Sequence, residues 1–144
     1  MRKTMTALLA SAALFNTAAH AAMEEQQWGN WFGNINIMEL ELNADNAKGE
    51  RITLTCTGGH LAVAYSVPAD DYRVSSETGL AEPGLSIDSK AYPLGEAAFT
   101  ALKKAGESGQ VRVTSMGQNM SKPFKTIGLQ DALQDVTWQD CISR

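Results

Sequence analysis

The stretch that decides the fold is Arg51–Val67, which reads RITLTCTGGHLAVAYSV. Apolar side chains alternate with other residues on both sides of Gly58 and Gly59, and a period of two places them on one face of a strand. Two glycines supply the positive φ angles that a tight hairpin turn needs. The stretch therefore predicts an antiparallel hairpin with one buried face, formed by Ile52, Leu54, Cys56, Leu61, Val63, Tyr65 and Val67.

This hairpin contains one of the two cysteines of the chain, and the other lies close to the end. Two cysteines in an exported protein most often form a disulfide, so we expect Cys56 to pair with Cys141. On the chain-entropy model, closing a loop of about 85 residues stabilises a fold by roughly 4–5 kcal/mol. A redox pair would favour a Cys-x-x-Cys motif or an electropositive helix start, whereas Cys56 lies in a predicted strand between threonines. We therefore expect a structural bridge.

Residues 1–21 have the features of a signal peptide. Arg2 and Lys3 form a short positive region, residues 5–15 are dominated by Ala, Leu and Met, and Ala19-His20-Ala21 fits the small-x-small rule for cleavage. The apolar run is too short for a permanent transmembrane helix, and no cysteine follows it to carry a lipid. We expect cleavage after Ala21, export, and no stable membrane insertion.

Removal of this segment leaves 123 of the 144 residues, which is the size of one domain with a real core. The segment carries two basic and no acidic side chains, so 10 basic and 16 acidic side chains remain and the net charge is −6. Nucleic acids and anionic membranes attract cationic surfaces. The charge therefore argues against either as a direct partner.

Residues 22–33, AMEEQQWGNWFG, form a polar N-terminal arm with three clustered aromatic side chains, Trp28, Trp31 and Phe32. An exposed aromatic cluster is a common anchor for a protein partner. The alternative is that the arm packs these rings over one end of the core. The sequence is compatible with both, and the first interpretation makes the three residues a candidate binding surface.

Residues 34–144 are expected to form a single β-rich domain. Its first segment, Asn34–Leu42, alternates between apolar and polar residues, but the parity changes between Ile37 and Met38. One extra residue at that point would return all the apolar side chains to one face of the sheet. We therefore predict one strand with a β-bulge.

Two later segments have helical periodicity. Residues 95–105 combine an apolar stripe with an acid in the first turn, two lysines in the last turn and a glycine after it, and residues 128–136 have a similar stripe. Alternating segments at 110–116 and 124–127 predict strands, and Trp138 and Cys141 are expected to close the chain against the sheet. The pattern predicts a mainly β (α+β) fold: a small antiparallel β-sandwich or barrel with two short helices and one disulfide.

The chain offers little catalytic chemistry. After removal of residues 1–21 its only histidine is His60, so a histidine-rich metal site cannot form within one chain. A Ser-His-Asp triad through His60 would lack a nucleophile-elbow motif such as Gly-x-Ser-x-Gly. Neighbouring surface acids are far more often solvated charges than an acid and base pair; the candidates here are Glu24/Glu25, Asp70/Asp71 and Asp131/Asp135. We therefore expect no enzyme activity, no cofactor and no metal.

A second candidate surface is the cluster Ser121–Thr126, SKPFKT, where Lys122 and Lys125 flank an aromatic residue in an otherwise acidic protein. Such a patch fits an acidic partner. The alternative is an edge strand whose lysines deter pairing with another sheet.

The order of features from Ile35 to Cys141 resembles the VasI-type accessory proteins of bacterial type VI secretion, which are small periplasmic domains with two cysteines. The resemblance is carried by a strand before Ile52-Thr-Leu-Thr-Cys56, a helix-to-strand unit at Phe99–Val113, and the pattern Phe124-x-x-x-Gly128-Leu129-x-x-Ala132-Leu133 leading to Cys141. The Trp-rich arm and the lysine cluster are not expected from that family. The resemblance implies a non-enzymatic periplasmic accessory or binding module in which both cysteines are structural.

Two classes of function follow. The first is an exported periplasmic protein-binding module, an accessory component of a secretion or envelope system. The second is a periplasmic inhibitor or immunity protein that neutralises a cell-envelope-targeting enzyme by inserting a loop or a polar cluster into it. A hydrolase that depends on His60 is a third. In the first two classes the partner is another protein of the cell envelope, and the expected contact surface is Trp28, Trp31, Phe32, Lys122 and Lys125.

Overall fold

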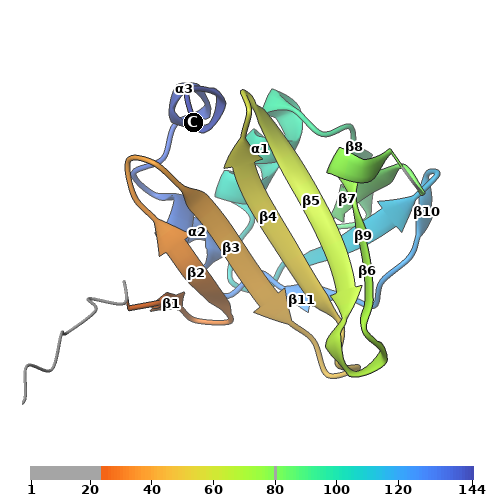
Figure 1. Cartoon of the computed structure of the whole chain (residues 1–144). Coiled ribbons are helices and arrows are strands. Elements are labelled where there is room, and N and C mark those ends of the chain that lie inside the picture. The colour runs from red at the N-terminus through yellow and green to blue at the C-terminus, as the bar shows by residue number, and fades with distance from the viewer. Residues whose placement is uncertain (1–23, 80) are drawn as a thin grey trace, which may run out of the picture.

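Two antiparallel sheets enclose the hydrophobic core (Figure 1). The computed structural model describes residues 24–79 and 81–144. The expected signal peptide, its cleavage site and the first two residues of the expected arm lie outside the described residues. The prediction of a mainly β, antiparallel fold is confirmed.

The first sheet has six strands in sequential order, so each strand pairs with the next one along the chain. Every pair is antiparallel. The strands are β1 (Gln26–Trp28), β2 (Trp31–Ile35), β3 (Leu40–Asp45), β4 (Arg51–Thr57), β5 (His60–Val67) and β6 (Tyr72–Ser75). Short 3-10 turns, η1 (Pro68–Asp70) and η2 (Ser76–Thr78), precede and follow β6.

The predicted central hairpin is confirmed as β4 and β5. Gly58 and Gly59 form its turn with φ angles of 58° and 84°, which residues with side chains rarely adopt. The register pairs Ile52 with Tyr65 and Cys56 with Leu61, so the alternating apolar side chains fall on the same face of both strands. That face is buried and forms the centre of the core.

The second sheet is smaller and its strands are ordered β10-β9-β7-β8, and β11 also pairs with β9, on the edge where β10 pairs. These strands are β7 (Pro83–Ile87), β8 (Lys90–Tyr92), β9 (Gln110–Ser115), β10 (Gln118–Asn119) and β11 (Phe124–Lys125). Between β8 and β9 lies α1 (Glu96–Lys104), which buries Ala98, Phe99 and Leu102 as its apolar stripe predicts.

The end of the chain contains two helices where one was predicted. The helix expected at residues 128–136 is present as α2 (Leu129–Leu133). The segment expected to run against the sheet is instead α3 (Trp138–Ile142), so three α-helices occur among the described residues rather than two. A capping box explains α3: the Thr137 hydroxyl accepts from the Asp140 amide, and the Asp140 carboxylate accepts from the Thr137 amide.

The prediction of one bulged strand over Asn34–Leu42 is wrong. The chain reverses direction there, because β2 ends at Ile35 and β3 begins at Leu40, and the two strands pair with each other. The Asn36 side chain stabilises the reversal by accepting hydrogen bonds from the amides of Met38 and Glu39 at 2.8 and 2.9 Å. The change of parity therefore marks a turn whose apolar tip points away from the core.

The expected N-terminal arm is not separate from the domain. Residues 26–33 form β1 and the start of β2, and Trp31 pairs directly with Ala44 of β3. The boundary expected between residues 33 and 34 does not divide two units, because β2 crosses it.

The expected disulfide is present and joins α3 to β4. Cys56 and Cys141 have their sulfur atoms 2.09 Å apart, and both residues are buried. The last helix is thereby attached to the central hairpin, and α3 packs against both β4 and β5.

We predict that replacing both cysteines with alanine lowers the free energy of unfolding by about 4–5 kcal/mol, because the unfolded chain regains the entropy of an open loop. Urea unfolding of C56A/C141A and of the oxidised wild type measures the difference. A change below about 1 kcal/mol would contradict the assigned role of the bridge.

Candidate partner-binding site

The structure brings together the two surfaces that the sequence singled out. The indole nitrogen of Trp31 donates a hydrogen bond of 2.9 Å to the carbonyl oxygen of Lys125. The amide of Asn30 donates a second one, also 2.9 Å, to the carbonyl of Ile127. The β1–β2 hairpin is therefore docked on the segment that contains the lysine cluster.

The five predicted contact residues differ in accessibility. Trp31 is completely buried, so the expectation that it lies on a binding surface is wrong: its ring fills the core and its N–H is already paired. Trp28 and Phe32 are half-buried, whereas Lys122 and Lys125 are exposed. The accessible part of the predicted surface is thus Trp28, Phe32 and the two lysines.

The contact between the hairpin and this segment leaves no room for a side chain at Gly128. This residue has φ +88°, and a Cβ atom built on it would lie 1.9 Å from the carbonyl oxygen of Trp28. Only glycine tolerates both this backbone angle and the close contact with the Trp28 carbonyl. Trp28 is therefore held in place by backbone contact.

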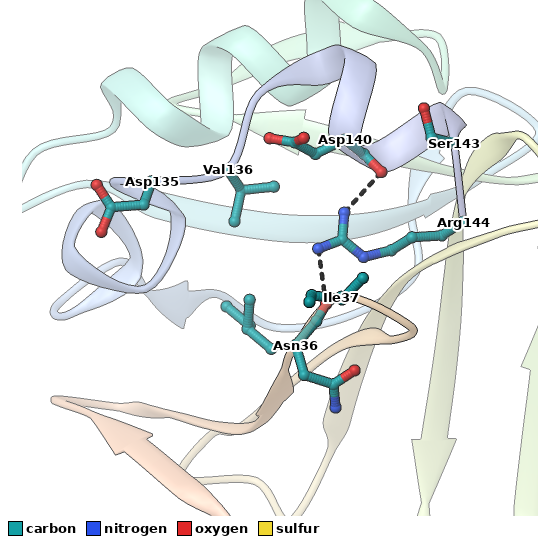
Figure 2. Close-up of a pocket in the computed structure, with 8 residues that line it drawn as sticks. Asn36, Ile37, Asp135, Val136, Asp140, Ser143 and Arg144 are labelled. Atoms are coloured by element: carbon teal, nitrogen blue, oxygen red, sulfur yellow. Dashed lines mark hydrogen bonds between the residues drawn. The ribbon is translucent and has the colours of Figure 1, made fainter.

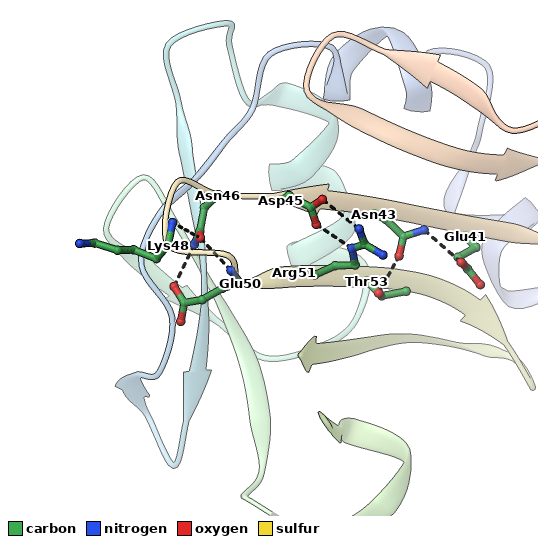
Figure 3. A network of polar contacts seen from close by, with 8 residues as sticks. All are labelled: Glu41, Asn43, Asp45, Asn46, Lys48, Glu50, Arg51 and Thr53. Atoms are coloured by element: carbon green, nitrogen blue, oxygen red, sulfur yellow. Dashed lines mark hydrogen bonds and ion pairs between the residues drawn. The ribbon is translucent and has the colours of Figure 1, made fainter. Parts of the chain in front are cut away.

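A buried carboxylate, that of Glu50, joins three parts of the chain at this end of the sheet. Figure 3 shows one of its partners, the Asn46 side chain, together with the neighbouring pair of Arg51 and Asp45. The Glu50 oxygens accept hydrogen bonds from the Asn46 side chain at 2.9 Å, from the Lys122 amide at 2.8 Å, and from the Tyr65 hydroxyl. Nearby, Arg51 forms two hydrogen bonds with Asp45 and lies over the Phe32 ring, 5.1 Å from its centroid. The lysine cluster is thus positioned by charged hydrogen bonds.

The pKa of Glu50 is lower than its ordinary value of 4.5. Burial alone would raise this pKa, but the hydrogen bonds from Tyr65, Asn46 and Lys122 and the charge of Lys122 outweigh it. The pKa of Tyr65 is raised, first by burial and then by the Glu50 carboxylate. Glu50 therefore remains ionised and has a structural role, unlike a general acid, whose pKa would be raised.

The most exposed apolar residues lie at the opposite end of the β2–β3 hairpin. Ile37 is 92% exposed and Met38 is 85% exposed, although they are adjacent. Hydrogen bonds hold the turn that carries them. The Asn36 side chain accepts from the two amides named above, and the Asn36 backbone amide donates to the Glu39 carbonyl at 2.9 Å. We call Asn36–Glu39 the hairpin tip.

Arg144 supports the hairpin tip from the side of α3 (Figure 2). Its guanidinium donates to the carbonyl oxygen of Asn36 at 2.9 Å and to that of Asp140 at 2.6 Å. Between the tip and the last two helices lies an open groove of about 530 Å³. Its lining residues are Ile35, Asn36, Ile37, Asp135, Val136, Asp140, Ser143 and Arg144. The tip and the groove together form an apolar projection beside a hollow lined by both aliphatic and charged side chains.

Sequence reasoning missed this surface. The change of parity at Ile37 and Met38 predicts a bulge, which places both residues in a strand. The signal for a turn was Asn36, because an asparagine followed by a reversal commonly bonds to the amides two and three residues later. Nothing in the sequence pairs Arg144 with Asn36, which is 108 residues away.

His60 forms an exposed ion pair with Glu77 at the β4–β5 turn. The pKa of His60 is raised, mainly by the Glu77 hydrogen bond. Within residues 24–79 and 81–144, no serine hydroxyl bonds to His60, and no cluster of three metal-ligating side chains occurs. The expectations of no enzyme activity and no metal stay predictions.

Comparison of the chain with protein-family models, with curated proteins and with solved structures finds no match. Among the helices that the structure describes, none is long and apolar enough to cross a membrane.

We predict that Glu50→Gln destabilises the protein by about 1–3 kcal/mol at neutral pH and weakens its acid sensitivity. Because the folded pKa is lowered, the carboxylate stabilises the fold above pH 4.5 and this contribution is lost as pH falls through the folded pKa. Urea unfolding of the variant and the wild type between about pH 7 and pH 3 measures how steeply the free energy of unfolding of each protein falls with pH.

Glu107→Gln is the matched control, because Glu107 is exposed. It should reproduce the wild-type stability and the wild-type acid sensitivity. Identical pH profiles for the Glu50 variant and the wild type would show that this carboxylate does not hold the segment.

Proposed function

We propose that this protein is an exported, non-enzymatic module of the bacterial periplasm that binds another protein of the cell envelope, as an accessory component of a secretion or envelope system. The composition of residues 1–21 and the buried disulfide support export. The observation that carries the binding proposal is the hairpin tip, with two adjacent apolar side chains almost entirely in solvent.

The energetics of the tip favour a protein contact. Burying one large apolar side chain contributes about 1.5–3 kcal/mol, so two neighbours can act as the anchor of an interface. Hydrogen bonds that the Asn36 side chain accepts and one that Arg144 donates already order the backbone of the tip, so binding loses little further conformational entropy there. A rigid apolar anchor of this kind gives affinity from a small area.

The accessible residues of the surface that the sequence predicts are a second proposed contact. Trp28, Phe32, Lys122 and Lys125 lie near the end of the hairpin where Trp31 pairs with Ala44, whereas the tip lies beyond the pair of Ile35 and Leu40. The two surfaces are at opposite ends of β2 and β3. Separate variants can therefore test them independently.

The inhibitor class is the second candidate function, and the rigidity of the tip favours it. A loop that enters an enzyme cleft must keep its shape without the enzyme, and the side chain of Asn36 bonds two successive amides of this turn. If the captured partner is an enzyme of the cell envelope, the inhibitor proposal predicts that its activity falls when wild-type protein is added in excess. Unchanged activity would favour the accessory role.

We predict that Ile37→Ser with Met38→Ser reduces capture of the envelope partner at least tenfold, because both apolar contacts are lost. Immobilised purified wild type and variant are incubated with envelope extract of the producing cells, and captured proteins are quantified by mass spectrometry. Met116→Ser is the matched control, since Met116 is 74% exposed and lies in the β9–β10 turn of the other sheet.

A parallel bait carries Lys122→Ala and Lys125→Ala and tests the second surface. Equal recovery of the same proteins on the wild-type and tip-variant baits would remove the tip from the proposed function. Equal recovery on the lysine-variant bait would remove the lysine cluster.

A further inference from the structure

A polar groove lies on the outer face of the second sheet, away from the hairpin tip. Its floor comes from two neighbouring strands, with Ser86 of β7 directly opposite Arg112 of β9. Thr114, two residues along β9, lies opposite Asn119 of β10. The groove has a volume of about 470 Å³ and is lined by Ser86, Ser89, Ala91, Arg112, Thr114, Gly117, Gln118 and Asn119.

The chemistry of this lining is uniform apart from one charge. Hydroxyl and carboxamide side chains supply both donors and acceptors, and Arg112 is the only ionisable residue among them. The chain as a whole carries 16 acidic and 12 basic side chains, yet no carboxylate lines the groove. The local charge therefore opposes that of the whole protein.

The polar groups of the floor are not used by the rest of the described chain. Within residues 24–79 and 81–144, no side-chain hydrogen bond or ion pair involves Ser86, Arg112 or Thr114. The other half-buried arginines differ, because Arg51 pairs with Asp45 and Arg144 donates to two carbonyls. The donors of Arg112 are thus available to a ligand.

A glycine keeps the floor open beside Thr114. Gly84 lies opposite Thr114 in the β7–β9 pair, and a Cβ atom at this position would come within 2.9 Å of the Thr114 hydroxyl oxygen. The positions on β7 and β8 nearest to Arg112 and Thr114 in the register are therefore small residues, Gly84, Ser86 and Ala91.

We propose that this groove binds a small hydroxylated oxyanion, such as a sugar acid or a polyol phosphate. The planar guanidinium fork of Arg112 matches the two oxygens of a carboxylate or phosphate group. The hydroxyl and carboxamide groups around it pair with the hydroxyl groups of the ligand. This site is independent of the proposed protein-binding function.

The test is an NMR titration of the purified, disulfide-bonded protein with three probes at constant ionic strength: glucuronate, glycerol 3-phosphate and glucose. The proposal predicts saturable shifts at the amides of Ser86, Arg112 and Gln118 with at least one of the two anions. The neutral glucose should bind at least tenfold more weakly, because it leaves the guanidinium unpaired. The two anions distinguish a carboxylate from a phosphate ligand.

Arg112→Gln should weaken anion binding at least tenfold. Arg112→Lys keeps the charge but loses the planar fork, so its affinity for the anion should lie between those of the wild type and the Gln variant. Arg73→Gln is the matched control, since it removes the same charge from an exposed position on β6 and should bind as the wild type does. The same spectra report whether each variant is folded. Four results would each overturn the proposal. Two concern the wild type: glucose binds as tightly as the anions, or no saturable shift occurs at tens of millimolar anion. Two concern the variants: the Arg112 variants bind anions as tightly as the wild type, or the Arg73 variant loses as much affinity as they do.

Discussion

The covalent bond between Cys56 and Cys141 is the constraint on which the arrangement of the proposed site depends. It attaches the short helix α3 to the central strand β4, and a helix of this length has little stability by itself. Arg144 follows this helix and donates to the backbone of Asn36 in the hairpin tip. The bridge therefore stabilises the fold and also positions the residue that supports the most exposed apolar surface.

The other end of the same hairpin is held by a buried charge. Glu50 connects the β3–β4 turn with Tyr65 and with the amide of Lys122, and Trp31 bonds to the carbonyl of Lys125. The strands β2 and β3 are thus anchored at one end by the disulfide-bound helix and at the other by hydrogen bonds to a carboxylate. This double attachment explains how the β2–β3 hairpin keeps its tip ordered although Ile37 and Met38 lie almost entirely in solvent.

Local patterns in the sequence predicted the elements that depend on local chemistry. The alternation in Arg51–Val67 and its two glycines were sufficient for the β4–β5 hairpin, and the apolar stripe was sufficient for α1. The break at Ile37 was ambiguous, because a bulge and a reversal both change the parity of a strand. The burial of Trp31, the contacts of Glu50 and the floor around Arg112 depend on residues distant in sequence, which periodicity cannot pair. The fold class was therefore predictable, whereas the candidate site was largely not.

The central claim is that oxidation joins the end of the chain to its middle and so shapes the proposed binding surface. Peptide mapping by mass spectrometry, without reduction and with free thiols alkylated at harvest, tests it on protein taken from the cells that produce it. The account predicts one cross-linked peptide pair that contains Cys56 and Cys141 in nearly all molecules. Recovery of both cysteines as alkylated thiols in folded protein would contradict it.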